Sequence, residues 1–133
     1  MPRPKKSRKV TKPPRMKGFK PFGIPACELK MLELSIEEYE SLKLVNYDGL
    51  SQEESAIKMD VSRPTFTRIY NKALKIIAKG FVEGKGIEIV GGDYHFDDDW
   101  FRCKRCFKLI QGKDNHIPCR NCPAFGDQEL TLI

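Results

Sequence analysis

The sequence has no long apolar run, no apolar segment behind its charged N-terminus and no catalytic signature. A membrane-spanning helix needs roughly 18 consecutive apolar residues, and no stretch of the chain approaches that length. A secretory signal needs an apolar core after its basic start, and none follows here. The nucleophile elbow G-x-S-x-G, the Walker phosphate loop and the H-E-x-x-H motif are all missing. We therefore expect a cytoplasmic protein that does not span a membrane and is not an enzyme.

Acidic residues are missing from the first 20 positions, which hold nine lysines or arginines and several prolines. The whole chain carries a net charge of +6, so the remainder is slightly acidic. Proline opposes helix formation and this composition buries little, which predicts a disordered basic arm over residues 1–18. Unless it is only a solubility tail, the arm would add salt-dependent attraction to nucleic-acid phosphates. The candidate contacts in the arm are Arg3, Lys5, Lys6, Arg8 and Lys9.

Three helix start signals follow the arm. Ser35 and Ser51 are each followed three residues later by Glu, the spacing of a capping box. Ser62 precedes a third helix whose proline falls in the first turn, where it is tolerated. Apolar residues at helical spacing then continue, and Gly84 is expected to end the helix. Residues 19–92 are therefore predicted to form a mainly α domain.

The second and third helices have the pattern of a helix-turn-helix. Two helices that cross closely need a small residue at the contact, and Ala56 supplies it. The turn needs a residue that tolerates a positive φ, and Asp60 is better suited to this than most residues. Phe66 and Ile69 then face the core, whereas Ser55 occupies a position that is normally apolar.

The remaining side of the third helix is polar and basic, which favours DNA binding. Arginine pairs with guanine and asparagine with adenine in the major groove, and the helix N-terminus attracts phosphate. A structural hairpin with a solvated charged face is the alternative. The candidate DNA contacts are Arg63, Thr65, Thr67, Arg68 and Asn71 for bases, and Lys72, Ser51 and Gln52 for the backbone.

Several segments in order resemble a known group of small bacterial and archaeal proteins. They are MPRPKK, FKPFGIP, EEYESLKL, DGLSQEESAIKMDVSRPTFTRI and FVEGKGIEIVGG. Over about residues 1–92 the chain resembles uncharacterised protein family 0251, also called domain of unknown function 134. The resemblance implies a DNA-binding helix-turn-helix similar to region 4 of sigma-70-type factors, with its reading helix at residues 63–72.

Four of the five cysteines form two C-x-x-C pairs in the last third of the chain. Two such pairs can enclose a tetrahedral zinc ion, and four thiolates leave no open position for a catalytic water. Iron has the same ligand set, a thiol-redox pair is a further alternative, and His116 could replace one ligand. Cys27 is expected to be a buried thiol. The predicted ligands are Cys103, Cys106, Cys119 and Cys122.

The sequence thus predicts a mainly α protein, a sigma region-4-like three-helix domain with a small C-terminal β zinc ribbon over residues 93–133. Residues 94–96 and 100–102 could form a hairpin across three aspartates. The expected partner is double-stranded DNA, and the expected role is transcriptional regulation. A zinc-stabilised adaptor that binds RNA polymerase or another transcription protein is the alternative. A homodimer is compatible with the sequence, although no heptad repeat marks a dimer helix.

Overall fold

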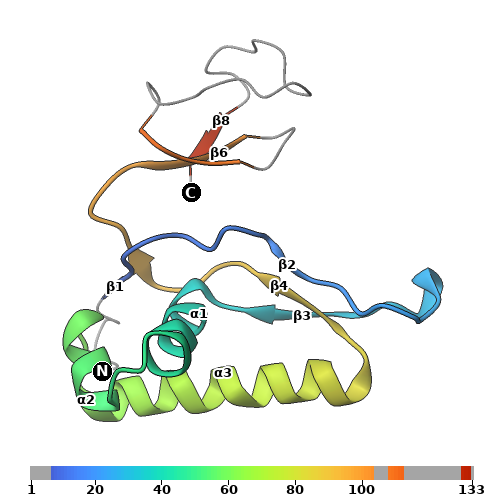
Figure 1. Ribbon diagram of the computed structural model, residues 1–133, viewed down its shortest axis with the longest axis horizontal. Coiled ribbons are helices and arrows are strands. Elements are labelled where there is room, and N and C mark those ends of the chain that lie inside the picture. Colours follow the sequence, from blue (N-terminus) through green and yellow to red (C-terminus); the bar gives the residue numbers. More distant parts are fainter. Residues whose placement is uncertain (1–6, 104–107, 113–129, 133) are drawn as a thin grey trace, which may run out of the picture.

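A computed structural model describes residues 7–103, 108–112 and 130–132 of the chain. Its helices gather at one side of the molecule and its strands at the other (Figure 1). The helical elements are the 3₁₀ turn η1 (Ala26–Glu28), α1 (Ile36–Leu42), the π-helical turn η2 (Lys43–Tyr47), α2 (Gln52–Lys58) and α3 (Arg63–Glu83).

The strands form three small sheets. In the first, β1 (Arg8–Lys9) pairs in parallel with β5 (Tyr94–His95). The second has the order β2 (Gly18–Phe19), β4 (Gly86–Ile89), β3 (Met31–Leu34). The third has the order β7 (Leu109–Gln111), β6 (Trp100–Cys103), β8 (Leu130–Leu132).

The prediction of a mainly α protein is wrong, because the structure is mixed α/β. β3 and β4 are parallel neighbours, and the three α-helices form the crossover between them. Each of these strands has only four residues, and each pairs with a segment more than 50 positions away. A strand this short gives a weak local signal, and no local pattern shows that these two strands pair.

The predicted helix boundaries are confirmed. The hydroxyls of Ser35, Ser51 and Ser62 accept hydrogen bonds from the amides of the third residue of their helices, at 3.1, 3.1 and 3.4 Å. Gly84 ends α3 in the left-handed conformation, with a φ of 68°. Capping serines and a C-terminal glycine therefore fix where the helices begin and end.

The arm is ordered from Ser7 onward, which differs from the prediction that residues 1–18 are disordered. The Lys9 amide donates to the Met59 carbonyl at the end of α2, at 3.0 Å. Val10 is fully buried, and Arg102 of β6 donates to the Pro14 carbonyl at 2.7 Å. Burial of Val10 and these hydrogen bonds help to hold the segment against the body. Arg3, Lys5 and Lys6 lie outside the described residues.

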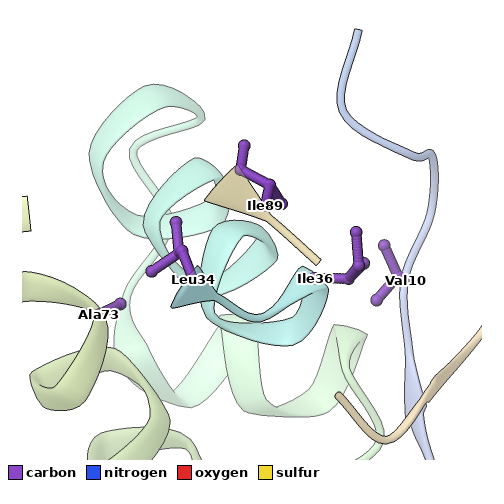
Figure 2. Packing of buried hydrophobic residues seen from close by; sticks show 5 residues of the cluster. All are labelled: Val10, Leu34, Ile36, Ala73 and Ile89. Atoms are coloured by element: carbon purple, nitrogen blue, oxygen red, sulfur yellow. The ribbon is translucent and has the colours of Figure 1, made fainter. Parts of the chain in front are cut away.

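Two hydrophobic clusters meet at α3. The first contains Val10, Leu34, Ile36, Ala73 and Ile89, and its side chains come from the arm, α1, α3 and both parallel strands (Figure 2). The second contains Leu44, Ala56, Met59 and Phe66. Because Phe66 and Ala73 belong to different clusters, the N-terminal half of α3 is held by both α1 and α2. No helix in the described part of the chain is apolar and long enough to cross a bilayer.

Candidate nucleic-acid interface

A tight left-handed turn joins α2 to α3. Asp60 has a φ of 57°, the only positive φ at a non-glycine residue among the described residues, as the sequence predicted. The Val61 amide donates to the Ala56 carbonyl at 3.0 Å. Ala56 is only 3% exposed, in agreement with a small residue at the helix contact. The chain therefore passes from α2 to α3 within residues 59–62.

Ser55 is buried at a position where an apolar side chain was expected. Its hydroxyl donates to the Ser51 carbonyl one turn earlier, at 2.8 Å. The hydroxyl is therefore satisfied inside α2 itself, and burying it costs little. The departure from the usual pattern does not disturb the crossing of the two helices.

Two side-chain contacts tie the beginning of α2 to α3. The Thr67 hydroxyl donates to Gln52 Oε1 at 2.7 Å, and Arg63 Nη1 lies 2.6 Å from Glu53 Oε1. The Arg63–Glu53 pair is more than 60% exposed on both sides, so water screens it and it contributes at most about 1 kcal/mol. A phosphate or a base could therefore replace Glu53 as the partner of Arg63 at small cost.

The predicted base-contacting residues differ in their solvent exposure and in the hydrogen bonds that their side chains already make. Thr65 is engaged in the helix cap, because its hydroxyl accepts from Ser62 Oγ at 2.9 Å and from Arg68 Nη2 at 3.4 Å. Thr67 is half-buried, whereas Arg68, Asn71 and Lys72 are exposed. We call Arg63, Thr67, Arg68 and Asn71 the reading face, since none of these four predicted base contacts belongs to the buried core of α3.

The arm residues nearest the body are engaged in ion pairs. Arg8 Nε lies 3.1 Å from Glu37 Oε2, and its side chain is 12% exposed. Lys9 Nζ lies 3.1 Å from Asp97 Oδ2. Arg8 and Lys9 therefore hold the arm on the body, and Arg8 in particular is poorly placed to meet phosphate. Sequence reasoning missed this role because neither acid is a neighbour of the arm in the sequence.

A basic pocket of about 420 Å³ between the arm and η2 was also missed. Its lining is Lys12, Pro13, Arg15, Tyr39, Lys43 and Tyr47. Burial raises the pKa of Tyr39, and the neighbouring Glu40 carboxylate adds to this, so the phenol stays protonated. The sequence carries the basic arm and Tyr39, Lys43 and Tyr47 at four-residue spacing, but no local pattern shows that these two segments lie together.

The cysteines are only partly described. Cys103 ends β6, and β7 begins at Leu109, so the first C-x-x-C pair begins where a β-hairpin connection begins. Cys106, Cys119, Cys122 and His116 lie outside the described residues. Among the residues that are described, no three His, Cys, Asp or Glu side chains gather as a metal site. Cys27 is exposed, so the prediction that it is buried is wrong.

Comparison with known proteins gives one consistent group. The sequence profile of the family described as "Protein of unknown function DUF134" matches residues 1–97. A "UPF0251 protein" of Halothermothrix orenii is 42% identical over 132 residues, which cover 97% of this chain and 98% of the relative. Another, from Moorella thermoacetica, is 40% identical over 130 residues, 98% of this chain and 86% of the relative. No solved structure matches the chain.

Proposed function

The chain belongs to the DUF134 (UPF0251) family, and we propose that it is a DNA-binding protein that regulates transcription. The observation that carries the proposal is the left-handed Asp60 turn between the short capped helix α2 and the longer capped helix α3, with Arg68 and Asn71 exposed on α3. This is the geometry that presents a helix to the major groove. Such a role would place the protein in the cytoplasm, at the nucleoid.

The reading face supplies base contacts in this proposal. Arg63 and Arg68 suit guanine and Asn71 suits adenine, while Thr67 offers a hydroxyl and a methyl group. Thr65 supports Arg68 from the cap and does not itself meet a base. Lys72 would contact phosphate, together with Ser51 and Gln52 at the N-terminus of α2.

Charge along α3 supports DNA over a protein partner. Arg68, Lys72, Lys75 and Lys79 are all exposed and follow one another at spacings of four, three and four residues. At 3.6 residues per turn they form one basic ridge beside the reading face. A ridge of this kind tracks a phosphate backbone, and its binding weakens as salt rises.

The position of Lys9 suggests how the arm would act. Its amide is bonded to Met59 at the C-terminus of α2, one residue before the left-handed turn. The described part of the arm therefore begins close to the end of α2, and the candidate contacts Arg3, Lys5 and Lys6 precede it in the sequence. In our proposal they add phosphate or minor-groove contacts from that point.

A second candidate function is an adaptor that docks on the transcription machinery. Ile57 on α2 favours it, because this large apolar side chain is 78% exposed. A docking surface of this kind would bind through apolar area, so its affinity would change little with salt.

We also propose one structural zinc ion held by Cys103, Cys106, Cys119 and Cys122. The three-stranded antiparallel sheet β7-β6-β8, with Cys103 at a strand end, fits a ribbon that holds metal at its hairpin connection. Elemental analysis of protein purified without chelator should give one zinc per chain. One iron per chain would identify an iron site instead, and reversible disulfides without metal would indicate a redox pair.

The test of DNA binding is a selection from random duplexes, followed by titration of the selected duplex at several salt concentrations. We expect a defined consensus and a dissociation constant that rises steeply with salt. No retention of random duplexes or of a genomic library at low salt would refute the proposal and favour the adaptor.

A further inference from the structure

An apolar stripe is left uncovered on the C-terminal half of α3. Leu74, Ile77 and Phe81 are spaced by three and four residues, so they lie on one side of the helix. They are 40%, 37% and 88% exposed. Phe81 is thus almost completely in solvent although it belongs to a residue class that is normally buried.

The stripe begins where the covering helices end. Tyr70, one turn earlier on the same side, stacks on Phe66 and donates to Asn46 Oδ1 at 3.1 Å, so η2 covers it. Beyond that point α3 extends past α1 and α2, toward the end of the molecule that carries η1 (Figure 1). In the described part of the chain, no element takes over the role of η2.

More apolar surface lies at the same end. Phe19 pairs across β2 and β4 with Ile87, which lies against Gly80 of α3, and Phe19 and the nearby Phe22 are 65% and 104% exposed. Each aromatic side chain can bury about 150–250 Å², so the three phenylalanines at their exposed fractions offer roughly 400–650 Å². With the aliphatic residues, the total approaches the roughly 800 Å² that each partner buries in a standard interface.

We propose that this stripe pairs with the same stripe of a second copy, with the two α3 helices antiparallel. The pairing itself goes beyond the proposed DNA-binding function, and only the fit to two half-sites rests on that function. An isologous pair needs a single self-complementary patch, and the apolar stripe is one. The basic ridge of Arg68, Lys72, Lys75 and Lys79 lies roughly 150° around the helix from the stripe, so the like charges of the two copies stay apart.

The orientation of the reading face fits this pairing. Thr67 and Asn71 lie roughly a quarter of a turn around α3 from the stripe, at about 100° per residue. In an antiparallel pair the two-fold axis is perpendicular to both helices and to the line that joins them. The reading faces of the two copies therefore point in the same direction along that axis, as two half-sites on one side of a duplex require.

The length of α3 fits as well. Thr67 and Arg63 lie ten and fourteen residues before Ile77, which is about 15–21 Å along a helix. Pairing around Ile77 places the reading ends of the two copies roughly 30–42 Å apart. That range contains the separation of about 34–36 Å between major grooves one helical turn apart.

Sedimentation equilibrium of the full chain without DNA tests the pairing. The wild type should have twice the 15.3 kDa chain mass at micromolar concentration. Phe81→Asp should raise the dimer dissociation constant by about tenfold or more, as expected when a central aromatic residue is lost. Val82→Asp is the matched control, because Val82 is the next residue, is 79% exposed and lies off the stripe. Its effect should stay within about threefold.

Two results would overturn the pairing. One is a wild-type chain that stays monomeric. The other is a dimer that Phe81→Asp weakens no more than Val82→Asp does. Circular dichroism melting curves of both variants check that the monomer is folded.

DNA binding separates the two proposals. If the chain dimerises and binds no DNA, the proposed function fails and the pairing stands. If both hold, the selected sites should be inverted repeats with centres about 10–10.5 base pairs apart. Phe81→Asp should then bind a single half-site as the wild type does and lose cooperativity on the repeat.

Discussion

The two halves of α3 share one continuous helix but have different neighbours. The first half packs on α1 and α2 through Phe66 and Ala73, both fully buried. The second half packs on β4, where Gly80 lets Ile87 approach so closely that a Cβ on the glycine would lie 3.0 Å from its Cδ1. The basic ridge runs along both halves, but only the second half also exposes large apolar side chains, Phe81 among them.

The difference indicates a division of tasks along one helix. The first half must be held rigidly by α1 and α2, because base contacts depend on the position of each side chain. The second half buries less of its apolar surface within the monomer, and the exposed remainder is available to a partner. A single helix would thus connect the DNA contacts to the dimer interface without a hinge.

The largest expected effect is the contrast between the two phenylalanines of α3. Phe66→Ala should lower the free energy of unfolding by about 3–5 kcal/mol, because it leaves a cavity between α1, α2 and α3. Phe81→Ala should change it by less than about 0.5 kcal/mol under conditions where the protein is monomeric. Urea denaturation at low protein concentration measures both. Equal losses would show that the second half is as tightly packed as the first.

The turn that orients the first half is the next test. Asp60→Val should cost roughly 1–3 kcal/mol, since a β-branched residue is strained at a φ of 57°. Asp60→Gly is the control and should be tolerated, because glycine adopts this conformation freely. Thermal melts of the two variants give the comparison. If Asp60→Val melts at the same temperature as Asp60→Gly, the left-handed turn does not determine how α3 is held against α2.

The N-cap of α3 should have a smaller effect. Ser62→Ala removes the acceptor of the Thr65 amide and also a contact to the Thr65 hydroxyl, for a loss of about 1 kcal/mol. Ser62→Asp restores the cap and should recover most of that stability. Because Thr65 accepts from Arg68, DNA affinity should fall with Ser62→Ala as well. Unchanged stability with alanine would contradict the role of the cap.

The smallest expected effect concerns Glu40, which is 1% exposed below the arm and accepts from the Thr11 hydroxyl at 3.3 Å. Burial raises the pKa of Glu40 above its ordinary value of 4.5, and Lys43 and Thr11 offset this only in part. The contribution to stability is therefore complete below pH 4.5 and is lost as the pH rises through the raised pKa. Glu40→Gln should remove that loss, so its melting temperature should exceed that of the wild type at neutral pH and not at acid pH. A constant difference at all pH values would show that the carboxyl does not titrate as described.

The sequence revealed the helices and their limits but not how the strands pair. Ser35, Ser51, Ser62 and Gly84 act on their immediate neighbours, so a local pattern was sufficient. The pairing of β3 with β4 depends on the return of the chain after α3, which no local pattern encodes. Residues 94–96 were expected to pair with residues 100–102, whereas β5 pairs with the arm and β6 with β7 and β8.

The sequence did not predict the exposed stripe, for a related reason. Ile77 has the same helical spacing as the buried Phe66, Ile69 and Ala73, so the sequence pattern assigns it to the core. Only the structure shows that α1 and η2 cover this side of α3 as far as Tyr70 and not beyond it. Arg8 and Lys9 were similarly assigned to DNA, because their partners Glu37 and Asp97 are far away in the sequence.

The most direct measurement of the central claim compares charge reversal at the two ends of the molecule. Arg68→Glu and Lys30→Glu change the net charge equally, and both side chains are exposed, but only Arg68 belongs to the reading face. Anisotropy titration of the selected duplex should show a loss of about 100-fold or more for Arg68→Glu, because a base contact and a phosphate attraction are both lost. Lys30→Glu should weaken binding by less than about threefold, through net charge alone. Equal losses for the two variants would contradict the account, since binding would then depend on total charge and not on α3.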